Sequence, residues 1–452
     1  MALIVRAPVP RDIDSVTTIR AEEEVPAHAV GGDDRELEKV WELVQGLYRS
    51  GIHPALQICI RRHGEVVMHR SIGYARGNGP GDPPDARKVV VTPETPFNVF
   101  SAAKAVTATL IHLLDERDLL HVDDAVCDYI PEFARHGKHR IAIKHLLNHR
   151  AGIATLPREA MQLDTLNDPA SLLEMICNLR PTSRPGGPLA YHAVSAGFVL
   201  AEIVQRITGK DIRRVMREQI VDPLGMRWTN YGVATRDLNH VAHSYFTGAH
   251  ILPPVSNMIA GLLGVSMQQA VTMSNDPRFL SAAIPSANIV TTANELSLFY
   301  QMLLNGGELG GTRILDPRTV RRATAEQSWM EPDRKLLAPI RYSQGFMLGA
   351  RYVSVFGPDS DKAFGHIGLT NIIGWADPER QIAGALMTSG KPLVYPELWS
   401  WYTIPWQVGT ALGKTEKRRA RKSSAKGPAT MKPSRAKPSQ TKRPPARKRR
   451  AS

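Results

Sequence analysis

The chain has 452 residues, 42% of them hydrophobic, which suits a soluble globular enzyme with one large core or two subdomains. It holds no run of 18 apolar residues, so we expect no transmembrane segment, and residues 1–14 lack the apolar stretch of a signal peptide. Its cysteines, Cys59, Cys127 and Cys177, are too scattered for a disulfide framework or a metal cluster. These features predict a cytoplasmic protein.

The net charge of +14 is concentrated at one end of the chain. Residues 414–452 hold 16 Lys/Arg and a single acid, Glu416, whereas residues 1–413 carry a net charge of −1. The segment 413–452 is rich in Pro, Ser and Ala, lacks aromatic residues, and is predicted to be a disordered basic tail. Such a tail is typical of weak, non-specific contact with nucleic acid or an anionic membrane, or of a solvated extension without a binding role.

Ahead of the tail, the sequence pattern predicts an extension and one mixed α/β unit. Residues 1–33 are polar and contain several prolines, so we expect an irregular extension. Residues 34–412 have strand-like runs near both ends and helical runs between them, at about 122–283. This order predicts one sheet built from both ends, with a helical subdomain inserted. The expected elements are helices at 34–49, 141–152, 196–208, 295–304 and 396–412, a hairpin at 56–61 and 66–72, and strands at 346–355 and 372–387.

Four segments have the pattern S-x-x-K, and only one lies where a pocket can form. Three of them begin in the basic tail, at positions 423, 434 and 439. The fourth, residues 101–104, opens an apolar helical run and places Lys104 one turn from Ser101 on the same face. A helix N-terminus favours an oxyanion, and a lysine within reach can manage the hydroxyl proton. A plain helix N-cap followed by a solvated lysine is the alternative interpretation.

Two further motifs follow in the chain. Tyr191 lies after a Pro/Gly-rich turn and before the helix expected at 196–208, and the His366-Ile367-Gly368 triplet precedes the strand run that begins at 372. Either motif alone has little specificity in a chain with 15 His and 35 Gly. Their order after Ser101 carries the information.

Some other polar and apolar features have a plainer interpretation. The Met- and Leu-rich segment 245–283 is typical of a buried helix pair, and an acyl-binding wall is the functional alternative. His145 and His149 are expected to make structural hydrogen bonds rather than to act in catalysis.

Taken together, these motifs resemble the serine β-lactamase-related superfamily, in the branch of class C β-lactamases, D-Ala-D-Ala carboxypeptidases and family VIII esterases. The resemblance extends beyond the triplets, to "IAIKHLLNHRAGI" at 141–153, "DPLGM" at 222–226, "IPSANIVTTANELSLFYQMLLNGGELGG" at 284–311 and "GHIGLTNIIGWADPE" at 365–379. It covers about residues 35–410. It implies a β-lactamase-like α/β fold with a mainly antiparallel sheet, flanked by helices and carrying an all-helical domain.

The resemblance also implies roles for particular residues. Ser101 would be the acylated nucleophile and Lys104 would relay its proton. Tyr191 would act as general base with the lysine, provided that neighbouring cations lower its pKa from the reference value near ~10. His366 and Gly368 would form the third motif, and the backbone N–H groups of Ser101 and Leu369 would form the oxyanion hole. No metal or cofactor is implied.

Departures from the family pattern favour a particular substrate class. Ala193 replaces the Asn that holds the amide side chain of a β-lactam, and His366 replaces the Lys of the usual third motif. We therefore expect a serine esterase or lipase acting on a small-molecule carboxylic ester. The alternatives are a D-amino-acid peptidase or a β-lactamase- or transpeptidase-like enzyme, and a nucleic-acid- or surface-binding protein with a degenerate hydrolase body.

Overall fold

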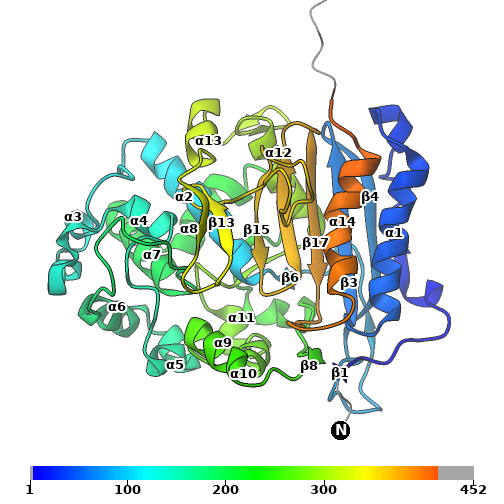
Figure 1. Cartoon of the computed structure of the whole chain (residues 1–452), viewed down its shortest axis with the longest axis horizontal. Helices are drawn as coiled ribbons and strands as arrows, with labels where there is room; N and C mark the ends of the chain where they lie inside the picture. Colours follow the sequence, from blue (N-terminus) through cyan, green and yellow to red (C-terminus); the bar gives the residue numbers. More distant parts are fainter. Residues whose placement is uncertain (1–3, 416–452) are drawn as a thin grey trace, which may run out of the picture. The chain divides into compact units, whose positions relative to one another are not determined.

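The computed structural model describes residues 4–415 (Figure 1). The basic tail lies outside the described residues, apart from its first three (413–415), and so does its expected contact with nucleic acid or an anionic membrane. Within 4–415, no helix is long and apolar enough to cross a membrane. The same residues contain no group of three or more His, Cys, Asp or Glu side chains arranged to hold a metal ion.

A ten-stranded sheet joins the two ends of the sequence. All of its pairings are antiparallel, and the central one sets β17 against β3, with Thr388 opposite Leu56 and Ile382 opposite Arg62. The mainly antiparallel sheet built from both ends is therefore confirmed. In spatial order the strands are β12 (Ser328–Pro332), β13 (Pro339–Tyr342), β14 (Met347–Leu348), β15 (Phe364–Gly368), β16 (Ile372–Asp377), β17 (Ile382–Thr388), β3 (Ala55–Arg62), β4 (Glu65–Arg76) and β2 (Thr17–Ile19), with β5 (Val89–Val90) on β4.

Helices cover both faces of this sheet, and two adjacent residues of β16 show how. A Cβ at Gly374 would lie 2.5 Å from Tyr300, so the missing side chain lets α12 (Ala293–Leu304) approach one face. The next side chain, Trp375, points to the other face and lines a cavity with residues of α14 (Leu398–Ala411). There α14 runs beside α1 (Asp34–Arg49), in orange and blue in Figure 1. The core lies between the sheet and these helices.

The inserted region is helical, as expected, and begins after α2 (Ala103–Glu116). A small second sheet lies where this helical region meets the ten-stranded sheet. Its strands are β6 (Phe97–Asn98), β9 (Ile289–Thr291) and β7 (Asn230–Tyr231). The helices of the region are α3 (Val126–Tyr129), α4 (Ile143–Leu147), α5 (Leu163–Leu166), α6 (Pro169–Asn178), α7 (Ser195–Thr208), α8 (Ile212–Met216), α9 (Val255–Leu263), α10 (Met267–Met273) and α11 (Pro277–Ser281). Helix α13 (Pro317–Ala323) and the hairpin β10 (Glu308–Leu309) and β11 (Thr312–Arg313) follow α12.

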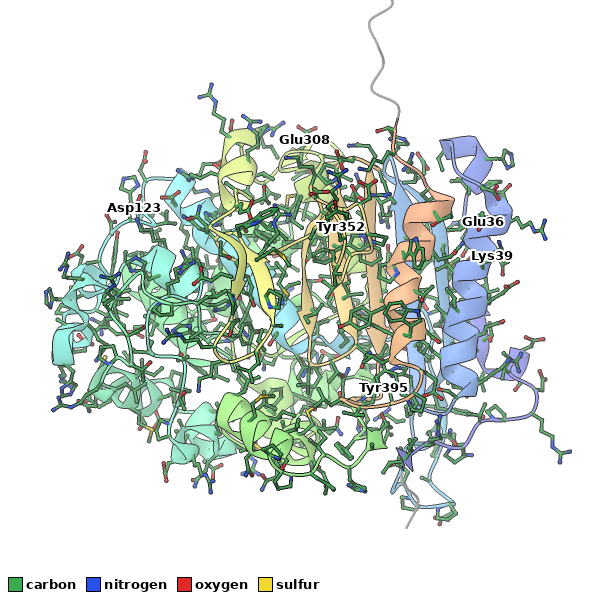
Figure 2. All side chains as sticks on the ribbon, in the orientation of Figure 1. Glu36, Lys39, Asp123, Glu308, Tyr352 and Tyr395 are labelled. Atoms are coloured by element: carbon green, nitrogen blue, oxygen red, sulfur yellow. The ribbon has the colours of Figure 1, made fainter. Side chains whose placement is uncertain are left out.

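The structure differs from the sequence pattern at three places. The helix expected at 141–152 is confined to the five residues of α4. Within the stretch expected to be irregular, β1 (Ile4–Val5) pairs with β8 (Gly248–Ala249) and β2 pairs with β4. The strand expected at 346–355 is reduced to the two residues of β14. Beyond β14 the apolar residues Tyr352 (labelled in Figure 2) and Val353 are exposed rather than packed in a sheet.

Candidate active site

Ser101 stands at a strained turn between a strand and a helix. The chain leaves β6, passes through the one-turn helix η3 (Phe100–Ala102), and enters α2. Phe100 has a φ of +48°, which is unfavourable for a bulky residue, and its N–H donates to Oδ1 of Asn98 at 3.3 Å. Such backbone strain persists only where the surrounding structure fixes it, and here it presents Ser101 on the first turn ahead of α2.

Lys104 points back toward Ser101 from the first turn of α2. Its Nζ donates to Ser101 Oγ at 3.2 Å, to the Ala193 carbonyl at 2.8 Å and to the Ser286 carbonyl at 3.0 Å. The side chain is buried, and burial lowers the pKa of Lys104 to about 7. Near neutral pH a large fraction of this amine is therefore uncharged and has a lone pair available for the Ser101 proton.

Tyr191 packs against the same lysine, with Lys104 Nζ 4.8 Å from its ring centroid. The His366 ring lies on another side, 6.4 Å away between centroids. Burial raises the pKa of Tyr191, and an interaction with the Ser101 hydroxyl opposes this only in part. The expected lowering of the phenol pKa by neighbouring cations is thus absent, because desolvation dominates. At neutral pH Tyr191 is a hydrogen-bond donor.

Asp333 fixes the backbone of Tyr191 and was not singled out by the sequence. Its Oδ1 accepts the N–H of Tyr191 at 3.1 Å, together with the N–H groups of Lys335 at 2.8 Å and Leu336 at 3.0 Å. The other carboxylate oxygen is buried and has no partner among the described residues. The only signal in the sequence is an Asp after a proline, which indicates a turn and says nothing of Tyr191.

The third motif lies at the end of β15. His366 is buried, its Nδ1–H donates to the Ile367 carbonyl at 2.7 Å, and burial lowers its pKa to about 3. It is therefore neutral at pH 7 and adds no fixed charge to the site. A Cβ at Gly368 would lie 2.0 Å from the Val99 carbonyl oxygen, so the glycine lets this strand end touch the turn that carries Ser101. The backbone of Leu369 follows directly.

Two further histidines make structural contacts, and one of them, His149, packs against Tyr191. The ring of His149 lies 4.7 Å from the Tyr191 ring and 5.0 Å from the Tyr342 ring, between centroids, and its Nδ1 accepts the N–H of His192 at 3.3 Å. His145 accepts the N–H of Ala142 at 3.1 Å and caps α4. Both contacts have the structural character expected from the sequence. The position of His149 against Tyr191 was not foreseen.

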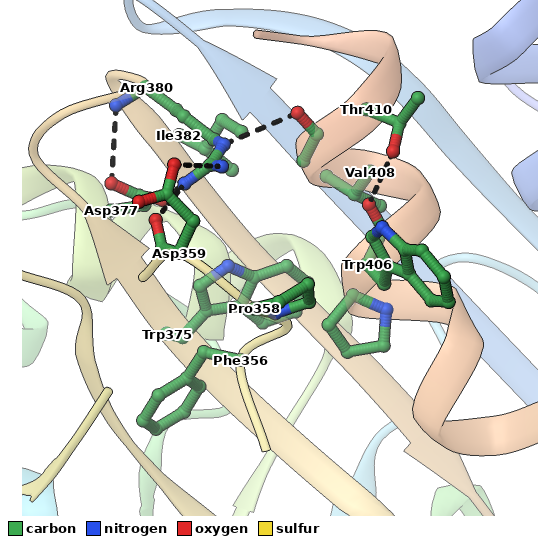
Figure 3. Close-up of a pocket in the computed structure, with 12 residues that line it drawn as sticks. Phe356, Pro358, Asp359, Trp375, Asp377, Arg380, Ile382, Trp406, Val408 and Thr410 are labelled. Carbon is green, nitrogen blue, oxygen red and sulfur yellow. Dashed lines mark hydrogen bonds and ion pairs between the residues drawn. The ribbon is translucent and has the colours of Figure 1, made fainter. Parts of the chain in front are cut away.

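Two cavities bear on the position of the site, and the larger of this pair lies away from these groups. It has a volume of about 160 Å³ and lies between β16, β17 and α14, lined by Trp375, Arg380 and Trp406 among others (Figure 3). The smaller, of about 20 Å³, lies beside Lys104 and His149. Because the larger cavity contains none of Ser101, Lys104 and Tyr191, we place the candidate active site by the contacts among these side chains rather than by cavity size.

An apolar helix pair borders the third motif. Ile259 of α9 and Met267 and Val271 of α10 form a small cluster, against which Leu369 packs from the end of β15, with Leu263 and Leu393 beside it. Of the nine residues of α9, only Ile259 is buried, although the helix is largely apolar. The Met- and Leu-rich segment thus lies next to Leu369, whose N–H the family resemblance implies for the oxyanion hole.

Comparison with known proteins points to one family. A family model for beta-lactamases matches residues 40–401. The chain is 31% identical over 333 residues to the esterase/beta-lactamase LipL of Mycobacterium tuberculosis, covering 71% of this chain and 76% of LipL. It resembles the structure of a penicillin-binding protein homologue from Caulobacter crescentus, with a TM-score of 0.71 and 25% identity over 84% of this chain and 99% of the homologue. It also resembles the structure of a family VIII carboxylesterase, with a TM-score of 0.70 and 25% identity over 83% of this chain and 98% of the carboxylesterase.

Proposed function

This chain belongs to the beta-lactamase family of serine hydrolases, and from that premise we propose that it hydrolyses carboxylic esters through an acyl-enzyme on Ser101. The observation that supports the proposal is the contact of Lys104 Nζ with Ser101 Oγ at 3.2 Å, in a site where burial lowers the lysine pKa to about 7. A serine hydroxyl is a weak nucleophile until a neighbouring base takes its proton.

The proposed acylation begins when the free amine of Lys104 takes the Ser101 proton. The serine oxygen attacks the ester carbonyl carbon, and the resulting oxyanion accepts hydrogen bonds from the N–H groups of Ser101 and Leu369. Tyr191, protonated in the resting site, donates its proton to the departing alkoxide and regains one from the ammonium of Lys104. The alcohol leaves, and the acyl group stays on Ser101.

Deacylation repeats these steps with water in place of the alcohol. Lys104, again a free amine, removes a proton from the attacking water, and the tetrahedral species uses the same two backbone donors. Ser101 leaves as the alkoxide, is reprotonated through Tyr191, and the carboxylic acid is released. No step needs a charge from His366. We propose that its side chain forms the wall of the site opposite Tyr191.

The choice of ester over β-lactam or peptide rests on two side chains. Ala193 contributes only its backbone carbonyl, which already accepts from Lys104, so no side-chain amide is present to hold a substrate amide. His366 is neutral, so it offers no cation to a β-lactam or peptide carboxylate. An ester needs neither contact. The similarity to a family VIII carboxylesterase supports the same class.

A fluorophosphonate probe tests the nucleophile. We expect a single adduct on Ser101 by peptide mass spectrometry, with loss of p-nitrophenyl ester hydrolysis. Ser101→Ala should abolish both while the circular dichroism spectrum is unchanged. Ser439→Ala, in another S-x-x-K segment, is the matched control and should keep wild-type rates. Near wild-type turnover by Ser101→Ala would overturn the assignment, and turnover of D-Ala-D-Ala peptides above that of esters would replace the esterase by a peptidase.

A further inference from the structure

A second buried lysine, Lys391, lies behind the turn that carries the nucleophile, and no step of the proposed mechanism uses it. Lys391 follows the end of β17 by three residues, and its side chain is fully buried. Its Nζ stands over the ring of Phe100, 5.2 Å from the ring centroid, and Phe100 is the residue before Ser101. Within residues 4–415, this Nζ donates to the Thr388 carbonyl and pairs with no acid.

The backbone around Lys391 is held on two sides, which fixes where its side chain begins. Ser389 donates its N–H to the Ala55 carbonyl at 3.0 Å and accepts the N–H of Ala55 on its Oγ at 2.7 Å. The N–H of Lys391 donates to the Tyr245 carbonyl at 2.8 Å. The lysine is thus anchored to β3 and to the segment before β8, while its Nζ reaches the ring of Phe100.

Burial of this amine is unfavourable for the fold, as a comparison with Lys138 indicates. Lys138 is also fully buried, with its Nζ 5.4 Å from the ring centroid of Phe133, but it donates to three carbonyls, at 2.9, 2.7 and 2.6 Å. Lys391 has one such acceptor, and burial lowers its pKa to about 7. Because a buried amine that lacks acceptors costs stability, stability alone would favour an apolar side chain at this position.

Phe100 is the residue through which Lys391 can act on the nucleophile. Its φ of +48° is strained, and such a conformation persists only where neighbouring contacts hold the residue. An amine or ammonium over the face of an aromatic ring is attracted to that ring, so Lys391 supplies one of these contacts. If the turn relaxed by about 1 Å, Ser101 Oγ would move away from Lys104, and a displacement of that size can cost about 10²-fold in rate.

We propose that Lys391 is a positioning residue, which holds Phe100 in its strained conformation and thereby keeps the Ser101 hydroxyl in place for attack. The inference rests on the proposed function, in which Ser101 is the nucleophile. It assigns a role in the reaction to a side chain that lies outside the three motifs.

Lys391→Met tests the proposal, because methionine fills a similar volume without the amine. We expect kcat for p-nitrophenyl acetate, and the rate at which a fluorophosphonate modifies Ser101, to fall by about tenfold or more, with KM changed by less than about twofold. The melting temperature should stay the same or rise, since an unfavourable buried amine is removed. The fall of kcat/KM below pH 7 should remain, because Lys104 is the proposed base.

Two further variants separate this role from a purely structural one. Lys138→Met is the matched control: it should lower the melting temperature, since three carbonyls lose their donor, while kcat keeps the wild-type value. Phe100→Leu removes the ring but keeps an apolar side chain at the same backbone position, and it should reduce kcat as Lys391→Met does. The Lys391→Met/Phe100→Leu double variant should be no slower than Phe100→Leu alone, because both changes remove one and the same contact.

The outcomes distinguish this inference from the proposed function. A wild-type enzyme that forms no fluorophosphonate adduct on Ser101 would contradict the proposed function, and the inference with it. With that adduct present, a wild-type kcat in Lys391→Met would overturn the inference alone. So would rate losses that multiply in the double variant, because Lys391 would then act independently of Phe100. A Lys391→Met protein that fails to fold would overturn it as well, because the lysine would then serve the fold.

Discussion

The end of β15 touches the turn before α2 through Gly368 and Val99, where a Cβ on the glycine would lie 2.0 Å from the valine carbonyl oxygen. No side chain other than hydrogen fits that distance. This contact ties the third motif to the backbone that carries Ser101, although the two are far apart in the sequence. The geometry of the proposed oxyanion hole therefore depends on a residue that contacts no substrate.

Gly368→Ala should separate these two segments. We expect kcat/KM for p-nitrophenyl acetate to fall by on the order of 10²-fold, the usual cost of losing one oxyanion donor. Gly46→Ala is the control, because a Cβ at Gly46 in α1 meets nothing within 4 Å. Steady-state kinetics of the two variants give the comparison, and a Gly368→Ala enzyme with wild-type kcat/KM would contradict the proposed donors.

The pH profile should report Lys104. Because the base must be a free amine and its pKa is lowered to about 7, kcat/KM should rise about tenfold per pH unit below 7 and level off above it. Lys104→Arg should be inactive at every pH, since a guanidinium does not lose its proton. Lys138 is the control, because it is a buried lysine that donates to three carbonyls and none of them belongs to the candidate site. Lys138→Met should therefore keep the fall of kcat/KM below pH 7. A flat profile between pH 5 and 8 would exclude Lys104 as the base.

The same pKa has a consequence for stability. Between about 7 and the reference value of 10.5, the unfolded chain holds a proton on Lys104 that the folded chain lacks. The free energy of unfolding contributed by this group therefore increases with pH across that window and is constant below it. Urea titrations of wild type and Lys104→Met at pH 7 and pH 9 measure the difference, and only the wild type should gain stability from this source.

Esters should be preferred to β-lactams. Two polar contacts are missing at Ala193 and His366, each worth roughly 1–3 kcal/mol, so kcat/KM for p-nitrophenyl acetate should exceed that for nitrocefin by on the order of 10²–10⁴. Ala193→Asn should narrow this gap, because it restores an amide beside Lys104. Equal efficiency of the wild type on both substrates would remove the basis for the esterase proposal.

Asp333 should act on catalysis through Tyr191. Asp333→Ala leaves three backbone N–H groups without their acceptor and frees the Tyr191 backbone, so kcat should fall by up to about 10²-fold with KM little changed. Asp333→Asn keeps an acceptor oxygen in the same place and should restore most of kcat. If Asn and Ala variants lose the same activity, the role of the carboxylate is not the positioning of Tyr191.

The α9–α10 cluster should respond to the length of the acyl chain. Leu263 lies with Leu369 at the edge of the site, so Leu263→Asp should raise KM for p-nitrophenyl octanoate more than for the acetate. Leu337→Asp, at a position that is 67% exposed, is the control and should affect neither substrate. An equal increase in KM for both substrates would mean that the cluster stabilises the fold and does not bind the acyl chain.

The local sequence pattern was sufficient to predict the long helices and strands and the order of the motifs. The helix expected at 34–49 has those bounds in the structure, because its apolar residues recur at helical spacing and Asp33 caps it through Glu36 N–H. The break at 378 between β16 and β17 follows from the turn-forming residues there. Two-residue strands such as β14 escape such reasoning, because they contain too few residues to show a period.

The polar contacts of the candidate site were harder to predict from the sequence. Asp333 meets Tyr191 across 142 residues of sequence, and nothing local marks the pair. Whether the pKa of Tyr191 is raised or lowered depends on how much water reaches the phenol, and a sequence does not state this. A nearby lysine suggested a lowered pKa, whereas burial raises it. The motifs nominate the candidate residues, while packing decides the protonation state that each side chain favours.

The pairing of β3 with β17 has a consequence for the way this protein is made. β3 is translated early, and its neighbour in the middle of the sheet, residues 382–388, emerges from the ribosome tens of seconds later. Throughout that interval the edge of β3 that pairs with β17 has no partner, and an unpaired strand edge is prone to pair with another chain. Nascent-chain protection by chaperones should therefore decide the yield of folded protein more than the stability of the finished fold.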